Sequence, residues 1–314
     1  MKAGLLGLLA CPACGGGLVS SEPPDARGEI PAGTLSCPAG HRYAVAGSVP
    51  HFSAEKEYVR AFDFIHKSPV CRLSEGPAAL SCRTLAEREF TAQTGFDPER
   101  MKWKRVLDAG CGGGRFLVHL AERGVRAVGF DLQSFVLTDC ASRHPDFELV
   151  QGDLFHPPFR EGSFDYIYSL GVLHHTPDPK AAFLNLVRLL RPGGKIAVWV
   201  YPKKFTTPFS DFWRPLTVRM PAGPLYAAGW AVTGLYGPLL KVPGLNRVLK
   251  RVLFRMRLPW HDDWSWRRHS FMDWYGARYQ FKYSPEELRA WFREAGLSDI
   301  RALDEETSMQ GTKL

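Results

Sequence analysis

The sequence has few cysteines, no large excess of charge of one sign and no long secretory signal. Its seven cysteines are an odd number and include Cys11-Pro-Ala-Cys14, so metal binding in a reducing compartment fits better than a disulfide framework. Hydrophobic residues at 45% and charged residues at 23% exclude a disordered, collagen-like or multi-span membrane protein. The apolar run at residues 4–10, which ends in Leu-Leu-Ala-Cys, is too short for a signal peptide, and we expect a cytoplasmic protein.

The length of 314 residues predicts one catalytic-sized domain with appendages. The net charge of +8 admits nucleic acid, an anionic membrane surface or an acidic substrate as a partner, and it selects none of them. Nothing in the pattern selects an oligomeric state. Changes in the pattern define five segments: a cysteine-containing segment at 1–52, a helical linker at 53–100, a core at 101–201, an insertion at 202–283, and the last helix and strands of the core at 284–314.

From residue 103 onward, short apolar runs alternate with helical periodicity, which is typical of a parallel α/β sheet. One helix carries an apolar stripe from Phe183 to Leu190 and is stopped by Arg191-Pro-Gly-Gly194. A second begins at the capping box Ser284-Pro-Glu-Glu287 and ends before Gly296. In the linker, helices are expected at residues 55–66 and 84–94. The expected strands are 104–109, 126–131, 147–151, 164–170, 195–201 and 297–303.

A glycine-rich turn follows the first of these strands and opens a helix through Phe116 to Ala121. Glycines permit a tight turn and a close approach of the backbone to a ligand. Asp131 ends the next strand, where an acid can accept hydrogen bonds from both hydroxyls of a ribose. Asp153 follows the third strand, a suitable place to contact an adenine amino group.

These motifs resemble those of the class I S-adenosylmethionine (SAM)-dependent methyltransferases. The matching stretches are Val106–Gly114, Phe130-Asp131, Gly152–Leu154, Phe164–His175 and Leu190–Gly194. The alternative, a dinucleotide-dependent oxidoreductase, would not explain the motifs that follow Asp131 in the sequence. The resemblance implies a Rossmann-like, seven-stranded α/β sheet. It also implies that SAM is held by Asp108, Gly110, Gly112 and Gly114 at the methionine part, by Asp131 at the ribose, and by Asp153 and Leu154 at the adenine, with Leu132 and Leu170 as further cofactor-binding residues.

Four residues of the first segment have the spacing of a structural zinc site. Cys11 and Cys14 form one pair, and Cys37 and His41 form the other, which gives four ligands with no open position. The segment resembles the zinc ribbons of methyltransferase-activating proteins and of some ribosomal RNA guanine methyltransferases. His51 is an alternative fourth ligand, and a metal-free reduced ribbon is the alternative to zinc.

Methyl transfer from a sulfonium is a direct displacement, so the enzyme mainly aligns the reactants and excludes water. His174 and His175 follow the fourth strand, where one imidazole could take a proton from the acceptor, while the alternative is packing of the Thr176-Pro177 turn. Tyr168 and Tyr201 are weaker candidates. The segment after this strand lacks the Asn/Asp-Pro-Pro-aromatic tetrad of base-amine methylation, and no Pro-Cys nucleophile of pyrimidine C5 methylation is present.

The insertion carries 14 Lys and Arg against 4 Asp, and it holds six of the nine tryptophans. Residues 221–240 have no charged side chain, so they could form a helical lid over an apolar substrate, an interfacial surface, or a membrane span weakened by prolines and glycines. An apolar stripe is expected next at Leu245, Val248, Leu249, Val252 and Met256, with Arg247, Arg251 and Arg255 on another face. The tryptophans between Trp260 and Trp266 could stack bases, cap an apolar pocket or fill the core.

The sequence thus predicts a methyltransferase that uses SAM and a structural zinc ion and acts on a small, apolar or acidic metabolite. RNA methylation is the alternative, because a zinc ribbon and a basic insertion also suit RNA binding. Peripheral membrane contact through residues 221–257 is a further expectation for the insertion. A SAM-binding scaffold without activity is disfavoured by the intact Asp108, Asp131 and Asp153.

Overall fold

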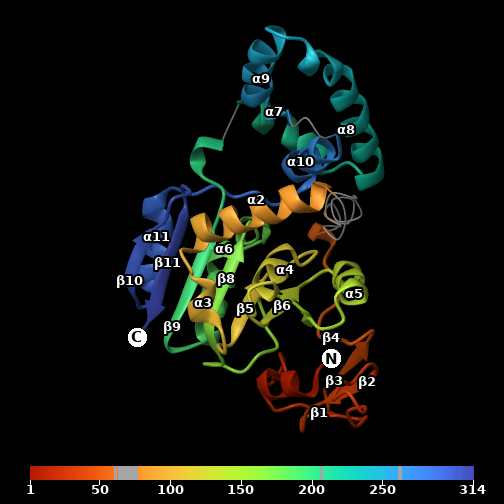
Figure 1. The fold of residues 1–314 in the computed structure, drawn as a ribbon, viewed down its shortest axis with the longest axis vertical. Helices are drawn as coiled ribbons and strands as arrows, with labels where there is room; N and C mark the ends of the chain where they lie inside the picture. Colours follow the sequence, from red (N-terminus) through yellow and green to blue (C-terminus); the bar gives the residue numbers. More distant parts are fainter. Residues whose placement is uncertain (60–61, 63–76, 206–207, 261–263) are drawn as a thin grey trace. The chain divides into compact units, whose positions relative to one another are not determined.

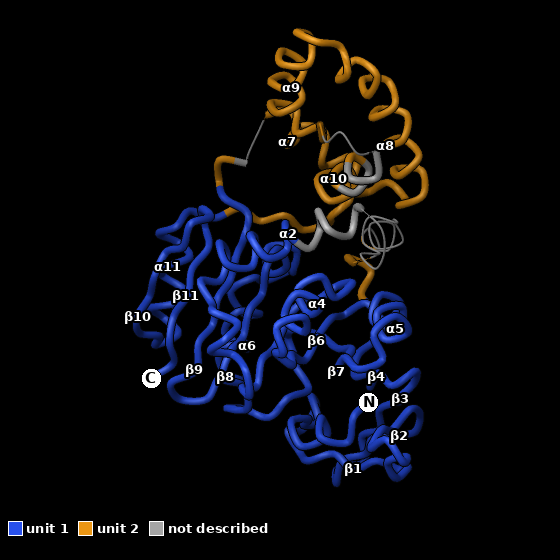
Figure 2. The backbone as a smooth tube through the Cα atoms, in the orientation of Figure 1, with its two compact units in different colours: residues 1–55, 74–202, 283–314 blue, residues 56–73, 203–282 orange. Residues whose placement is uncertain are grey.

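A computed structural model describes residues 1–59, 62, 77–205, 208–260 and 264–314 (Figure 1). The chain divides into two compact units, shown in Figure 2. Unit 1 holds residues 1–55, 74–202 and 283–314, and unit 2 holds residues 56–73 and 203–282. Half of the helix expected at residues 55–66, and part of the expected linker, lie outside the described residues.

Unit 1 contains the predicted Rossmann-like sheet of parallel strands. Its main part runs in the order β7-β6-β5-β8-β9-β11-β10, with β11 antiparallel to both β9 and β10. All six expected strands are present, although β9 begins five residues early and takes in Arg191–Gly194, because Leu190 already pairs with Phe164. The strands are β5 (Val106–Ala109), β6 (Ala127–Asp131), β7 (Glu148–Gln151), β8 (Phe164–Leu170), β9 (Leu190–Trp199), β10 (Leu297–Ala302) and β11 (Ser308–Lys313).

The sheet is larger than predicted, because seven strands form this main part and the described sheet has 11. Four short strands of the N-terminal segment extend its β7 edge, and β4 pairs in parallel with β7 through His51 and Gln151. The backbone N–H of Ala10 donates to the carbonyl of Pro158 at 3.0 Å, which ties the segment to the loop after β7. The segment consists of η1 (Ala3–Leu8), β1 (Val19–Ser20), β2 (Gly33–Ser36), β3 (Arg42–Ala46) and β4 (Val49–His51).

The N-terminal segment shares its hydrophobic core with the main sheet. Leu9 and Leu35 are fully buried in one cluster with Phe130 of β6 and Val150 of β7. A segment of about 50 residues buries too little apolar surface to be stable alone, and packing on the sheet supplies what it lacks. This is the physical reason why the sheet is larger than the core motifs indicate.

Helices cover both faces of the main sheet. Successive residues of a strand point to opposite faces, so Val106 of β5 belongs to a buried cluster with residues of α2 and α4, while Leu107 belongs to another cluster that includes residues of α6 and α11. As expected, α4 follows the glycine-rich turn and a complete capping box starts α11. The helices are α2 (Pro77–Thr94), α3 (Pro98–Met101), α4 (Arg115–Ala121), α5 (Ser134–Arg143), η4 (Leu173–His175), α6 (Pro179–Leu189) and α11 (Pro285–Glu294).

Unit 2 is helical in its described part and has its own core. Gly229 of α8 lies against Phe271 of α10, where an added Cβ would come within 2.5 Å of the ring, so the two helices pack closely. Leu225, Leu253 and Met272 are buried in the same cluster. Among the described residues, no helix is both long and apolar enough to cross a membrane. The helices are η2 (Glu57–Val59), η5 (Lys203–Phe205), α7 (Pro208–Thr217), α8 (Ala222–Tyr236), η6 (Pro238–Lys241), α9 (Leu245–Met256) and α10 (Trp264–Gly276).

Candidate cofactor site and cysteine-histidine cluster

The glycine-rich turn between β5 and α4 is built from left-handed backbone. Gly110, Gly112 and Gly114 have φ values of +92°, +50° and +84°, which residues with a Cβ rarely adopt. At Gly110 a Cβ would also lie 2.3 Å from Val172 Cγ2. Val172 directly precedes η4, so the glycine turn touches the segment that carries His174 and His175.

Asp131 joins the glycine turn to the end of β6. Its Oδ2 accepts a hydrogen bond from the backbone N–H of Gly112 at 2.9 Å, and its Oδ1 accepts one from Gln133 at 3.0 Å. A carboxylate has about four acceptor positions, so capacity remains for the hydroxyls of a ribose. The hydrogen bond from Gly112 therefore holds the carboxylate of Asp131, the predicted ribose-binding residue, in position.

Asp108 is a buried carboxyl group at the end of β5, only 2% exposed. Among the described residues, no hydrogen-bond partner reaches its Oδ2. Burial raises the pKa of Asp108 to about 8; the neighbouring Tyr168 hydroxyl opposes this rise, and the charge of Asp131 adds to it. A cationic group placed here would donate a hydrogen bond to Oδ2. It would also offset the free-energy cost of burying the ionised carboxylate.

Asp108→Asn is expected to stabilise the protein at alkaline pH and to weaken SAM binding. The native carboxyl group keeps its proton up to about pH 8, whereas the unfolded one ionises near 3.8, so wild-type stability falls as pH rises through this window. The asparagine variant has no such loss, and its advantage should reach about 2 kcal/mol or more above pH 8. Urea unfolding at acidic and alkaline pH measures this difference, and isothermal titration calorimetry measures the SAM affinity.

The exposed Asp304 supplies the control, because Asp304→Asn should change neither property. An Asp108→Asn protein that binds SAM like the wild type would contradict the assignment of this residue.

Asp153 and Gln151 lie at the end of β7. Asp153 is buried, and its Oδ1 accepts a hydrogen bond from the backbone N–H of Phe155 at 3.0 Å. Gln151, which no sequence pattern identified, donates through Nε2 to the carbonyl of Leu132 at 2.8 Å. Its Oε1 accepts from the backbone N–H groups of Phe52 and Ser53, both at 3.2 Å. Gln151 thus connects the N-terminal segment to the residue that follows Asp131.

The two histidines after β8 lie in a buried aromatic cluster. The ring of His174 stacks on Tyr201 at 3.9 Å between centroids and lies 4.1 Å from that of His175. Among the described residues, neither ring nitrogen of His174 has a partner. Burial lowers the pKa of His174 well below its usual value, and the neighbouring His175 lowers it further, so the imidazole is neutral near pH 7 and is a weak base in this environment.

The other predicted positions border the same region. Leu132 follows Asp131, Leu154 is half-buried against the core of unit 1, and Leu170 is the last residue of β8. Tyr168 is fully buried beside Asp108, and burial raises its pKa well above the usual value, so it cannot take a proton as a base. The carboxyl ends of β5, β6, β7 and β8 together carry the predicted SAM-binding side chains, as expected for a parallel sheet.

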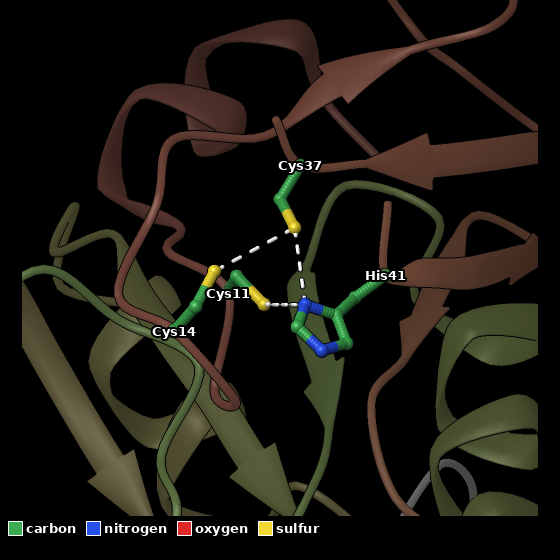
Figure 3. Close-up of side chains that lie close together, drawn as sticks. All are labelled: Cys11, Cys14, Cys37 and His41. Atoms are coloured by element: carbon green, nitrogen blue, oxygen red, sulfur yellow. Dashed lines mark hydrogen bonds between the residues drawn. The ribbon is translucent and has the colours of Figure 1, made fainter. Parts of the chain in front are cut away.

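Cys11, Cys14, Cys37 and His41 come together in the N-terminal segment, as Figure 3 shows. Their ligand atoms lie within 4.8 Å of one another. His41 Nδ1 is 3.3 Å from Cys37 Sγ and 3.6 Å from Cys11 Sγ, and Cys14 Sγ is 3.6 Å from Cys37 Sγ. A zinc ion with bonds of ~2.3 Å would hold tetrahedral ligands about 3.8 Å apart, so this donor set fits zinc.

Two tight turns hold the cluster. Gly15 donates to the carbonyl of Cys11 at 2.8 Å, and Gly40 donates to the carbonyl of Cys37 at 2.9 Å, so each pair of ligands is carried by a hydrogen-bonded turn. His51, the alternative fourth ligand, does not join them, because its Nδ1 lies 3.3 Å from Ser134 Oγ near the start of α5.

Comparison with known proteins places this arrangement in a family. A family model described as a methyltransferase domain matches residues 107–198, which span β5 to β9. An uncharacterised methyltransferase of Synechocystis is 32% identical over 153 residues, which cover 48% of this chain and 70% of that protein. The chain belongs to the SAM-dependent methyltransferases.

Other relatives of this methyltransferase act on named small molecules. The ubiquinone biosynthesis O-methyltransferase of Idiomarina loihiensis is 37% identical over 99 residues, covering 30% of this chain and 40% of that protein. The demethylmenaquinone methyltransferase of Beutenbergia cavernae is 33% identical over 105 residues, covering 33% and 42%. The chain thus spans less than half the length of these two relatives.

Two solved structures are similar to parts of the chain. A chain in the complex of the Haloferax volcanii methyltransferase activator with a methyltransferase has a TM-score of 0.43 and 16% identity, covering 78% of this chain and 98% of that one. A SAM-dependent methyltransferase from Mesorhizobium loti has a TM-score of 0.32 and 28% identity, covering 34% and 51%.

Proposed function

We propose that this methyltransferase transfers the methyl group of SAM to a small, apolar or acidic metabolite by direct displacement. The buried Asp108 oxygen without a described partner, beside a glycine turn that has no room for a Cβ at Gly110, is the observation that carries the proposal. The quinone methyltransferases that match the same part of the chain support a small acceptor.

The cofactor fits the residues present. Asp108 would offer a carboxylate to the ammonium group of SAM, and the glycines would admit its methionine part. Asp131 would hold the ribose, and Asp153 with Leu154 would hold the adenine. When bound, SAM supplies an electrophilic methyl carbon. The protein aligns the acceptor with this carbon and excludes water, and His174 or His175 takes the proton where the nucleophile carries one.

We further propose that Cys11, Cys14, Cys37 and His41 hold a structural zinc ion in an N-terminal ribbon. The close approach of three sulfurs and one imidazole nitrogen supports it, and four protein ligands leave no position for a substrate. The role that we propose for the helical insertion is that of a lid over the acceptor.

Transfer of a labelled methyl group tests the function. The purified protein is incubated with methyl-labelled SAM and either a small-molecule extract or total RNA, and the label is followed into each fraction. We expect label in a low-molecular-weight product, and an Asp131→Ala variant should lose it at least a hundredfold because it lacks both the ribose contacts and the bond to Gly112.

The matched control is Asp146→Ala, whose carboxylate is almost fully exposed and should leave transfer unchanged. Label in RNA alone would replace the metabolite by the RNA alternative. Absence of SAM binding in calorimetry would refute the enzyme assignment as a whole.

A further inference from the structure

Unit 2 exposes more large hydrophobic side chains than unit 1 does among the described residues. Among the described residues, 12 of the 16 exposed large hydrophobic side chains belong to unit 2, although it is the smaller unit. Six of them follow one another at spacings of three or four residues from the end of α8 through η6 to α9. We call this set the apolar ridge: Leu235, Leu239, Val242, Leu245, Val248 and Val252.

Helix α9 shows that the core of unit 2 covers only part of its apolar stripe. Leu253 is buried, and Leu249 and Met256 are half-buried against the same core. Val248 and Val252, on the same broad stripe, are 59% and 46% exposed. The prediction of one apolar face is thus correct for the helix, but half of that face points away from the unit's own core.

Helix α8 also has apolar side chains that the core of unit 2 does not cover. Leu225, Gly229 and Tyr236 face inward, while Leu235 on the outer side is 79% exposed. Because residues 221–240 contain no charged side chain, the outer side of α8 has no charge to hold it in water. A helix that is apolar on all sides is normally buried in protein or in lipid. Figure 2 shows α8 and α9 as the two arms of an arch within unit 2.

The charge around the ridge has one sign. Residues 212–260 contain eight Lys and Arg and no Asp or Glu. Arg214 and Arg257 are used inside the unit, where they donate to backbone carbonyls. Arg247, Arg251 and Arg255 are exposed, and within the described ranges no carboxylate pairs with them. On the α9 helix, Arg251 follows Val248 and Arg255 follows Val252, each at a spacing of three residues, so each pair shares one side of the helix.

We propose that the apolar ridge and these arginines form a docking surface for an anionic lipid bilayer. A bilayer offers both chemistries at once, since its head groups are negative and the region below them accepts apolar side chains. RNA phosphates would pair with the arginines, but the apolar ridge would remain exposed to water. A second copy of the chain on a symmetric contact would bring like charges together. The proposal goes beyond methyl transfer and does not depend on it.

Vesicle flotation of the whole protein tests the surface. Phosphatidylcholine vesicles are compared with vesicles that also contain phosphatidylglycerol, at low and high salt. We expect binding to the anionic vesicles that weakens with salt. A Val248→Asp/Val252→Asp variant should lose it at least tenfold. An Arg247→Gln/Arg251→Gln/Arg255→Gln variant should lose about a hundredfold at low salt, because each cation contributes about 1 kcal/mol near an anionic surface.

The matched control is Val19→Asp/Leu314→Asp, which changes two exposed apolar side chains of unit 1 and should bind vesicles like the wild type. Circular dichroism melting should show that all variants fold. No binding, or equal binding to both vesicle types, overturns the proposal. So does RNA binding lost only in the arginine variant, or a dimer in light scattering that the Val248→Asp/Val252→Asp variant abolishes, when either occurs without vesicle binding.

Discussion

If the proposed zinc site is correct, His41→Ala is expected to abolish zinc binding and to lower the free energy of unfolding by about 5 kcal/mol or more. Three ligands and a solvent position hold zinc far less tightly than four protein ligands, and the two turns of the N-terminal segment would lose the ion that joins them. The damage should extend to the main sheet, because Leu9 and Leu35 belong to the same core cluster as Phe130. Zinc content by mass spectrometry and urea unfolding measure the effect.

His41→Cys is the matched control, since a thiolate can replace the imidazole as the fourth ligand. It should retain zinc and most of the stability. SAM affinity gives a second readout, because Gln151 links the backbone of Phe52 to Leu132, and we expect it to fall about tenfold in the alanine variant. A zinc-free His41→Ala protein with the stability of the wild type would refute the structural role of the metal.

Gly110→Ala is expected to weaken SAM binding at least a hundredfold and to destabilise the protein by about 2–4 kcal/mol. The residue has φ of +92°, and the added Cβ would lie 2.3 Å from Val172 Cγ2, so both the backbone and η4 must move. Movement of this turn also breaks the bond from Gly112 to Asp131, which holds the ribose ligand in place. Calorimetry with SAM and thermal unfolding are the measurements.

Gly162→Ala separates the two causes of this effect. Gly162 has a similar φ of +67° but nothing within 4 Å of an added Cβ, so this variant should lose only about 1 kcal/mol and bind SAM normally. Adding Val172→Ala to Gly110→Ala removes the two nearest clashing atoms, Cγ1 and Cγ2 of Val172, and leaves its Cβ at 2.9 Å, so it should recover only part of the stability. Near-normal SAM affinity in Gly110→Ala would show that this turn does not hold the cofactor.

The main sheet and the glycine turn could be predicted from the sequence because their signals are local. Each core strand is a short apolar run, and Gly110 to Gly114 lie in consecutive residues between a strand and a helix. The strand count could not be predicted, because β4 joins β7 through one residue pair, His51 and Gln151, that are 100 residues apart. For the same reason no local pattern identified Gln151, whose partners at Phe52, Ser53 and Leu132 come from two distant segments.

The insertion shows a different limit of sequence patterns. The period of Leu245, Val248, Leu249, Val252 and Met256 correctly predicts that they share one side of a helix. Periodicity cannot say what covers that side, because the same stripe suits a protein core, a lipid surface or a partner. In the structure, the core of unit 2 covers Leu249 and Met256 in part and leaves Val248 and Val252 exposed.

The pairing of β4 with β7 also bears on solubility and on how the protein can be shortened. An open sheet edge invites pairing with the strands of other molecules, and β4 closes the end of β7 where Gln151 lies. Without residues 1–52, the β7 edge and the side chains of Phe130 and Val150 would lose their cover, and the remaining sheet would tend to aggregate. We therefore expect the N-terminal segment to cover the β7 edge and to prevent intermolecular strand pairing there.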